Sequence, residues 1–239
     1  MRQISNYVYC DDFVADLRLE TRLMPNPYYD FPYLIIEGFL SPEACAEIAA
    51  FTRERNEGEQ ARVKKSLMGV VVPELEEDIR KTVIHRLPEI LLEGYHLSFA
   101  YHQKRIEDYF SVALTTATEV QALEYTPGGF YIKHADDSND VVNAEGETVG
   151  FAQVAPERKI STVLFATTHA SHGGPGLHFS GGELVFDYLR DAQGHPVRIR
   201  PKAGDMVVFP SNPLYSHEVI AVEEGYRLTL VQWHDAIIA

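Results

Sequence analysis

The second half of the chain consists of short apolar runs separated by turns, and this pattern restricts the fold more than any other feature. From Glu119 onward about eight such runs follow one another, and Gly, Pro, Asn or Asp residues mark most of the breaks. No helical stretch separates the runs, which is typical of an antiparallel sandwich or barrel. Their number suits a double-stranded β-helix, or jelly-roll. The runs are VQALEY, FYIKH, KISTVLFAT, GELVFDYL, PVRIR, MVVFP, HEVIAV and YRLTLVQW.

The first half has helical periodicity instead, which predicts helices that buttress the jelly-roll. The segment FLSPEACAEIAAFTRE begins a helix with Ser41 as N-cap and Pro42 at the first helical position. A second helical region is predicted from Glu74 to Phe110, divided or bent at Pro88 and Gly94. The apolar residues expected to pack on one face of the sheet include Ile79, Val83, Leu91, Leu97 and Tyr101.

The length of 239 residues suits one domain with a single sizeable core. We therefore expect residues 1–239 to form a single domain. Residues 1–115 would supply the helical buttress and the leading strands, and residues 116–239 the jelly-roll core. One leading strand is predicted at residues 61–73, ARVKKSLMGVVVP, and is closed by Pro73. The predicted fold class is mainly β with N-terminal helices.

The charge balance and the cysteines restrict the partners and the compartment. Asp plus Glu number 35 against 21 Lys plus Arg, and a net charge of −14 repels phosphate backbones, so nucleic-acid binding is not expected. The acidic field could favour a cationic substrate, although acidic surfaces more often serve only solubility. No secretory signal and no membrane-spanning run is evident. Cys10 and Cys45 have no neighbouring ligand, which predicts reduced thiols in a cytoplasmic protein.

Two stretches between the predicted strands are candidates for surrounding a functional site. Residues 137–158 are acidic and lack aliphatic periodicity, and a loop of this length is more often a functional lid than a structural necessity. The stretch THASHGGPGLHFSGG brings His169, His172 and His178 close together in sequence. A zinc site is one interpretation, but the absence of helical spacing and of a paired cysteine favours a substrate-facing loop. The histidines predicted on helices, and expected to be partly exposed, are His85, His96 and His102.

The motif His134-Ala135-Asp136, followed far downstream by His217, is the strongest candidate for a metal site. Residues i and i+2 of a strand point to the same face, so His134 and Asp136 can converge on one ion. His217 opens a later strand and can supply a third ligand from across the barrel. Two imidazoles and one carboxylate leave coordination positions open, which suits Fe(II). The alternative for the short motif alone is a turn-capping Asp beside an exposed His.

Arg227 lies on the strand predicted after the Glu223-Glu224-Gly225 turn. A hairpin at this turn would bring Arg227 beside His217. A guanidinium is planar and can bind a carboxylate through two parallel hydrogen bonds. The alternative is an arginine at the barrel edge, paired with an acidic neighbour such as Glu224.

Residues 119–234 resemble the catalytic core of the prolyl 4-hydroxylase-like 2-oxoglutarate/Fe(II) dioxygenases. Five landmarks stand in the family's order: LEYTPGGFYIKHAD, STVLF, FSGGELVF, PKAGDMVVFPS and HEV…GYRLTLVQW. The earlier FPYLIIEGFLSPEACAEI also resembles the segment that leads into this core. The resemblance covers nearly all of the chain except the acidic loop and the middle helices.

The resemblance implies that His134, Asp136 and His217 bind Fe(II), and that Arg227 binds the distal carboxylate of the co-substrate 2-oxoglutarate. Many relatives place a tyrosine upstream of the His-x-Asp motif to contact the co-substrate. The candidates for this pocket are Tyr125, Tyr131 and, with the same strand facing as Arg227, Thr229. Ascorbate is a further candidate cofactor.

The predicted activity is therefore hydroxylation of a C–H bond with release of succinate and CO2. Family resemblance favours a peptide substrate hydroxylated at proline, and amino acids and small metabolites are the alternatives. Two other classes of protein are alternatives: a degenerate jelly-roll that acts as a sensor or binding module, and a cupin-type metal enzyme. A cupin would carry His-x-His followed by Glu where this chain has His-x-Asp, and it leaves Arg227 unexplained.

Overall fold

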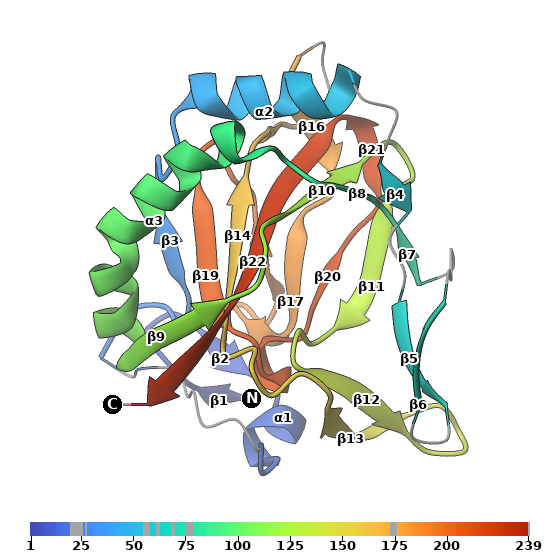
Figure 1. Cartoon of the computed structure of the whole chain (residues 1–239). Helices are drawn as coiled ribbons and strands as arrows, with labels where there is room; N and C mark the ends of the chain where they lie inside the picture. The colour runs from blue at the N-terminus through green and yellow to red at the C-terminus, as the bar shows by residue number, and fades with distance from the viewer. Residues whose placement is uncertain are drawn as a thin grey trace.

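Two antiparallel sheets, built largely from the second half of the chain, form the centre of the fold (Figure 1). The computed structural model describes residues 1–19, 26, 28–54, 58–60, 63–67, 70–74, 79–172 and 176–238. The eight-stranded sheet has the order β3 (Leu34–Ile36), β19 (Met206–Pro210), β14 (Ile160–Phe165), β22 (Arg227–Ile238), β10 (Gln121–Tyr125), β8 (Val83–His85) and β4 (Glu59–Gln60), with β9 (Val112–Ala117) paired to β22.

The seven-stranded sheet carries the strands that present both candidate histidine ligands. Its order is β1 (Arg2–Gln3), β2 (Tyr9–Cys10), β17 (Leu184–Arg190), β20 (His217–Val219), β11 (Phe130–His134) and β7 (Arg80–Lys81), with β18 (Pro196–Ile199) paired to β17. The smaller sheets pair β12 (Ser138–Val142) with β13 (Thr148–Gln153), β5 (Val63–Leu67) with β6 (Val70–Glu74), and β16 (His178–Gly181) with both β15 (Thr168–His169) and β21 (Val222–Gly225).

Helices cover the outer face of the eight-stranded sheet, as Figure 1 shows for α2 (Pro42–Glu54) and α3 (Glu89–Phe110). The shorter elements are α1 (Asp12–Asp16) and the 3-10 helix η1 (Pro213–Tyr215). Within the described residues, no helix combines the length and the apolar character needed to cross a membrane.

The eight-stranded sheet is apolar on both faces, because it separates two cores. One core lies between the sheets and includes Phe165, Phe186 and Phe209. The other lies under the helices and includes Leu164 and Tyr95. Adjacent residues of β14 thus enter different cores, and this explains why ISTVLF is apolar without strict alternation.

The structure confirms the mainly β jelly-roll with helical buttresses. The Ser41 hydroxyl accepts a hydrogen bond from the backbone N–H of Ala44 (3.2 Å), as expected of an N-cap. Cys10 and Cys45 are buried and free. Strands of the first half, among them β2, β3 and β8, belong to the two main sheets and join them to the jelly-roll strands.

The prediction of a helical region from Glu74 to Phe110 is wrong in its first part. Glu74 ends a strand, and β7 and β8 precede the helix, which begins at Glu89 after Pro88. β8 carries β-branched Val83 and Ile84, which favour a pleated surface, and it pairs with β10. Pro88 is the N-cap residue of α3 in an extended conformation, and Gly94 lies inside the helix without dividing it.

The predicted buried face of α3 is also partly wrong. Leu97 and Tyr101 are 68% and 82% exposed. The buried positions of this helix are Leu92, Tyr95, Ile106 and Phe110. α3 has apolar residues around much of its circumference, and the face that packs on the sheet differs from the predicted one.

Two segments form hairpins where the sequence predicted a loop in one case and a single strand in the other. Residues 137–158 are not a structureless loop, because β12 and β13 form an antiparallel hairpin there. The segment 61–73 contributes β5 and part of β6, which pair with each other, so Pro73 lies within a strand; residues 61, 62, 68 and 69 lie outside the described part of the chain. The predicted strand at 217–222 is divided between β20 and the start of β21.

Candidate active site

The three predicted metal ligands converge at one end of the jelly-roll. His134 ends β11, His217 begins β20, and the two residues are partners in the register of these strands. Ligand atoms of His134, Asp136 and His217 all lie within 4.8 Å of one another. The Nε2 of His134 is 3.9 Å from Oδ1 of Asp136, and the two imidazole centroids are 4.4 Å apart.

Backbone carbonyls orient both imidazoles for metal binding. Nδ1 of His134 lies 2.8 Å from the carbonyl oxygen of Ile132, and Nδ1 of His217 lies 3.0 Å from that of Tyr215. A carbonyl only accepts hydrogen bonds, so each Nδ1 carries the proton and each Nε2 presents its lone pair. Burial, together with the neighbouring His217, lowers the pKa of His134 to about 3, so this ring is neutral at physiological pH.

Asp136 is held as a carboxylate by its neighbours. The Ser161 hydroxyl donates to its Oδ2 (2.6 Å), and Nη1 of Arg158 donates to its backbone oxygen (3.1 Å). Burial raises the pKa of Asp136, but His217, His134 and the Ser161 hydrogen bond outweigh it and lower the pKa overall. Two imidazole nitrogens and one carboxylate oxygen fit the ligand set that suits Fe(II).

We predict that Ser161→Ala weakens metal binding about 10- to 100-fold, the usual effect of losing the hydrogen bond that orients a ligand. Titration of the purified protein with Mn(II), followed by calorimetry, measures this affinity. Ser138→Ala is the matched control, because the Ser138 hydroxyl donates to the carboxylate of Asp137 (2.7 Å), which is not a predicted ligand. Equal affinities of the Ser161→Ala and wild-type proteins would show that Ser161 does not orient Asp136.

Arg227 is a buried cation without an acidic partner. It is 1% exposed, its Nε donates to the carbonyl oxygen of Gly182 (2.8 Å), and Nη1 lies 3.5 Å from the Thr229 hydroxyl. Its guanidinium carbon is 4.6 Å from the centroid of Tyr125. Burial lowers its pKa to about 10, so it remains protonated at neutral pH. Among the described residues it forms no ion pair, so pairing with Glu224 does not explain it.

The structure separates the two candidate tyrosines. Tyr125 faces Arg227 across the β10–β22 register, whereas Tyr131 stacks on His134 with 3.6 Å between the ring centroids. Arg80 covers the Tyr131 ring, 4.6 Å from its centroid. Tyr125 and Thr229 thus lie with Arg227, and Tyr131 lies with the metal ligands.

The other histidines lie apart from this centre. Nε2 of His169 is 3.5 Å from the Glu183 carboxylate, and His172 and His178 are exposed. Of the described residues, only the triad groups three potential ligands closely enough for one metal ion. His85, predicted on a helix, lies instead in β8 and is buried.

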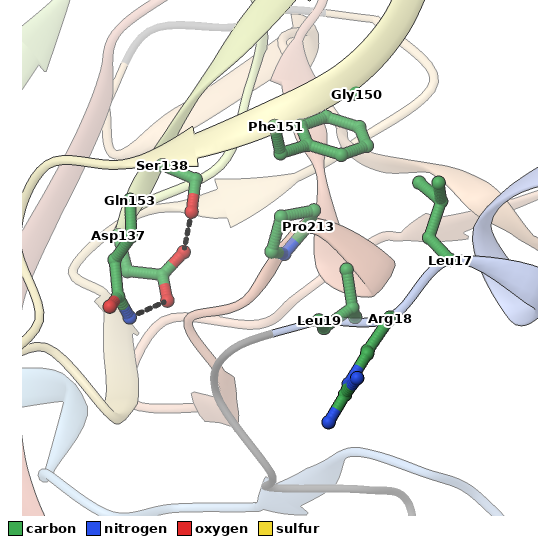
Figure 2. Close-up of a pocket in the computed structure, with 9 residues that line it drawn as sticks. All are labelled: Leu17, Arg18, Leu19, Asp137, Ser138, Gly150, Phe151, Gln153 and Pro213. Atoms are coloured by element: carbon green, nitrogen blue, oxygen red, sulfur yellow. Dashed lines mark hydrogen bonds between the residues drawn. The ribbon is translucent and has the colours of Figure 1, made fainter.

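The base of the β12–β13 hairpin borders a separate pocket of about 220 Å³ (Figure 2). Asp137 lies at its edge, and its carboxylate accepts hydrogen bonds from Ser138 (2.7 Å) and Gln153 (3.2 Å). These bonds join the two strands of the hairpin beside Asp136, a candidate metal ligand. The lining residues are Leu17, Arg18, Leu19, Asp137, Ser138, Gly150, Phe151, Gln153 and Pro213.

Sequence reasoning missed Ser161 and Arg158, both of which contact Asp136. Ser161 is the first of two polar residues in the STVLF landmark, and strand alternation with Val163 and Phe165 could have placed it toward the space between the sheets. Arg158 has no such signal, because it precedes β14 in an irregular segment.

Residues 120–235 match the family model of the 2OG-Fe(II) oxygenase superfamily. No curated protein sequence matches the chain significantly. A Pseudomonas putida prolyl-4-hydroxylase is similar at 24% identity, with 85% of this chain and 91% of that chain covered and a TM-score of 0.57. The viral collagen prolyl hydroxylase of Paramecium Bursaria Chlorella virus-1 has 17% identity, 86% and 96% coverage and a TM-score of 0.56.

A Trichoplax adhaerens prolyl hydroxylase is similar at 16% identity, with 85% of this chain and 83% of that chain covered and a TM-score of 0.59. At such identities these structures show that the fold is shared. The family model adds sequence evidence over the segment that contains the metal triad and Arg227. Residues 120–235 therefore match the 2OG-Fe(II) oxygenase superfamily, whose members use Fe(II) and 2-oxoglutarate.

Proposed function

We propose that His134, Asp136 and His217 hold Fe(II), and that Arg227 binds the distal carboxylate of 2-oxoglutarate. The observation that carries this proposal is the buried guanidinium of Arg227, which has no acidic partner among the described residues and lies in the same jelly-roll as the triad. Phe209 packs beside His217, with 5.1 Å between the ring centroids, and it belongs to the same hydrophobic core as Tyr125.

When bound, Fe(II) and 2-oxoglutarate would supply oxidation of a substrate C–H bond by dioxygen, giving the alcohol, succinate and CO2. The chain's own residues bind and orient the reactants. The Nε2 atoms of His134 and His217 and a carboxylate oxygen of Asp136 would hold the ion. Tyr125 and Phe165 exclude water from Arg227, which strengthens its attraction for a carboxylate. Thr229 lines this end of the pocket, and ascorbate remains a candidate reductant.

We further propose a peptide substrate, hydroxylated at proline. Two of the similar structures are a collagen prolyl hydroxylase and a prolyl hydroxylase bound to a peptide fragment of hypoxia inducible factor. Amino acids and small metabolites are the alternative substrates, and the net charge of −14 argues against nucleic acid.

Sheet pairing and the free cysteines bear on the domain organisation and the location of the protein. We propose that residues 1–239 act as one domain, because β2, β3 and β8 of the first half add to the sheets of the jelly-roll. A cytoplasmic location stays a prediction from the sequence, supported by the free thiols of Cys10 and Cys45.

The two alternatives differ in how well they account for the site. The match to the 2OG-Fe(II) oxygenase superfamily argues against a cupin. A degenerate sensor would be expected to lose a ligand or the anchoring arginine, and this chain retains the triad and Arg227.

The substrate class can be tested by measuring succinate formation over proline-containing peptides, free amino acids and metabolites. We expect a proline peptide to stimulate succinate release and to gain one oxygen atom, as measured by mass spectrometry. The same peptide with alanine in place of the target proline is the control. Stimulation by amino acids alone would overturn the peptide assignment. Anaerobic binding of Fe(II) and 2-oxoglutarate with no stimulation by any compound would favour the sensor.

A further inference from the structure

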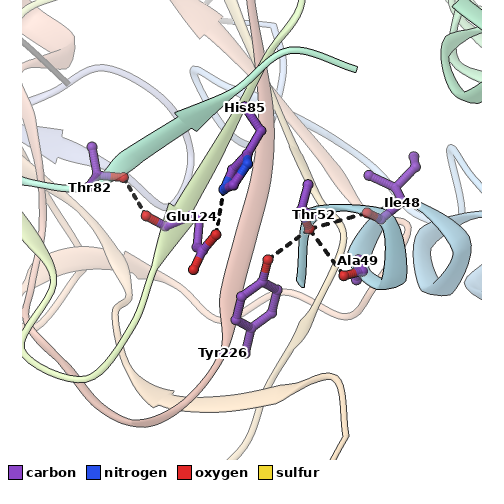
Figure 3. A network of polar contacts seen from close by, with 7 residues as sticks. All are labelled: Ile48, Ala49, Thr52, Thr82, His85, Glu124 and Tyr226. Carbon is purple, nitrogen blue, oxygen red and sulfur yellow. Dashed lines mark hydrogen bonds and ion pairs between the residues drawn. The ribbon is translucent and has the colours of Figure 1, made fainter. Parts of the chain in front are cut away.

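A buried polar network lies on the outer face of the eight-stranded sheet, behind the residues at the Arg227 end of the site (Figure 3). Glu124 and Tyr226 belong to it, and they are the chain neighbours of Tyr125 and Arg227. Side chains alternate along a strand, so the network and the pocket occupy opposite faces of β10 and β22. The outer polar network, as we call it, consists of Thr52, His85, Glu124 and Tyr226.

Glu124 is fixed by β8 at both its side chain and its backbone. Nε2 of His85 donates to the Glu124 carboxylate (2.5 Å), and the Thr82 hydroxyl donates to the Glu124 carbonyl oxygen (2.6 Å). His85 is 6% exposed. Because a hydrogen bond in such a buried place is protected from water, it restricts the end of β10 effectively.

Tyr226 is fixed by α2. Its hydroxyl lies 2.7 Å from the Thr52 hydroxyl, which itself donates to the carbonyl oxygens of Ile48 (3.2 Å) and Ala49 (3.1 Å). Since the single Thr52 proton is used there, Tyr226 is the donor to Thr52. Burial, assisted by the nearby charge of Glu124, raises the pKa of Tyr226 to about 12, so the hydroxyl keeps its proton.

Tyr125 and Arg227 need such support because they lie at the end of a strand pairing. Tyr125 and Arg227 form the last pair of the β10–β22 register. Terminal pairs open more readily than central ones. Arg227 donates to the carbonyl oxygen of Gly182 (2.8 Å), and its planar group must be correctly aimed to bind a carboxylate with two hydrogen bonds.

We propose that Glu124 and Tyr226 are positioning residues for 2-oxoglutarate: the outer polar network holds the strand ends that aim Arg227 and Tyr125 at its distal carboxylate. This inference rests on the proposed function, in which Arg227 is the anchor. It requires no contact between the network and the co-substrate. A loosened strand end would misplace the guanidinium while leaving the metal triad, at the other end of the pocket, unchanged.

The test compares two keto acids in Tyr226→Phe, which removes only the hydroxyl. The acids are 2-oxoglutarate and 2-oxopentanoate, which has the same chain without the distal carboxylate. We expect the Mn(II)-loaded variant to bind 2-oxoglutarate about 3- to 10-fold more weakly in calorimetry, as expected from one hydrogen bond. Its affinity for 2-oxopentanoate should not change. In turnover, KM for 2-oxoglutarate should rise by the same factor at constant kcat.

Thr52→Val removes the acceptor of the same hydrogen bond and should reproduce this selective loss. The double variant should bind 2-oxoglutarate no more weakly than either single one, because both changes remove one interaction. Tyr95→Phe is the matched control. Tyr95 is also a fully buried tyrosine beneath the helices, and its hydroxyl donates to Gln232 (3.1 Å), farther along β22 from Arg227. This variant should retain both affinities.

Unchanged binding of 2-oxoglutarate in Tyr226→Phe and Thr52→Val would overturn the positioning role. An equal loss for both keto acids would also overturn it, because that result indicates general destabilisation. Arg227→Met distinguishes failure of the proposed anchor from failure of the positioning role. If it leaves the preference for 2-oxoglutarate intact, the anchor itself is wrong. If it abolishes the preference while the network variants retain it, only the positioning role fails.

Discussion

Succinate formation by the His134→Ala variant is expected to fall by more than about 100-fold, because removal of a ligand should exceed the loss caused by removing a ligand's hydrogen-bond partner. His134 provides one of three ligand atoms, and two remaining ligands bind a divalent ion weakly. Substrate-dependent release of succinate with added Fe(II) measures the effect, and Mn(II) calorimetry shows whether metal affinity falls in parallel.

His169→Ala is the appropriate control for this substitution. His169 is also largely buried and lies beside a carboxylate, with Nε2 3.5 Å from Glu183, but it is outside the triad. Its activity should remain within about twofold of wild type, as for most substitutions away from the reacting groups. Wild-type turnover in His134→Ala would contradict the ligand assignment.

Arg227→Met is expected to weaken 2-oxoglutarate binding to about the level of 2-oxopentanoate and, at the same time, to stabilise the ligand-free protein. A buried guanidinium without an acidic partner opposes folding, and an apolar side chain of similar length removes that cost, about 1–3 kcal/mol. Urea unfolding of the ligand-free protein should therefore show a higher midpoint for the variant. Natural binding sites commonly accept such a loss of stability in exchange for function.

The same variant should lose most of its response to the co-substrate. For the wild-type protein loaded with Mn(II), 2-oxoglutarate at 100 times its Kd should add about 2.7 kcal/mol to the free energy of unfolding. Arg227→Met should gain little of this. Arg227→Lys, which keeps the charge but not the planar fork, should show an intermediate response. A full response in Arg227→Met would exclude Arg227 as the anchor.

The position of the metal triad could be predicted because it depends on local rules. His134 and Asp136 are two residues apart at the end of a strand, and His217 opens a strand, so alternation and chain order sufficed. Arg227 was correctly predicted to lie on a strand after Gly225, but the expected hairpin with the His217 strand is wrong, because β20 and β22 belong to different sheets and β21 pairs with β16. Its isolation from acidic groups could not be predicted, because it depends on residues such as Gly182 that approach from another strand.

The secondary-structure predictions were wrong where the local sequence did not distinguish a strand from a helix or a loop. Ile79 and Val83 have helical spacing, but pairing of β8 with β10 outweighs that weak preference. The β12–β13 hairpin was missed although Asn143 and Gly146, between two valine-containing runs, form its turn. The outer polar network joins Thr52, His85 and Glu124 from three distant segments, and no local pattern in one sequence reveals such a contact.

The cation–π contact on Trp233 gives the protein a built-in optical reporter. The guanidinium carbon of Arg158 lies 4.0 Å from the centroid of Trp233, and Nη1 of the same group donates to the backbone oxygen of Asp136. Trp233 is the single tryptophan of the chain. A shift of the Asp136 backbone when metal or keto acid binds is therefore transmitted through one side chain to the only indole. We therefore expect its fluorescence to change when a metal binds at the candidate site, without any attached dye.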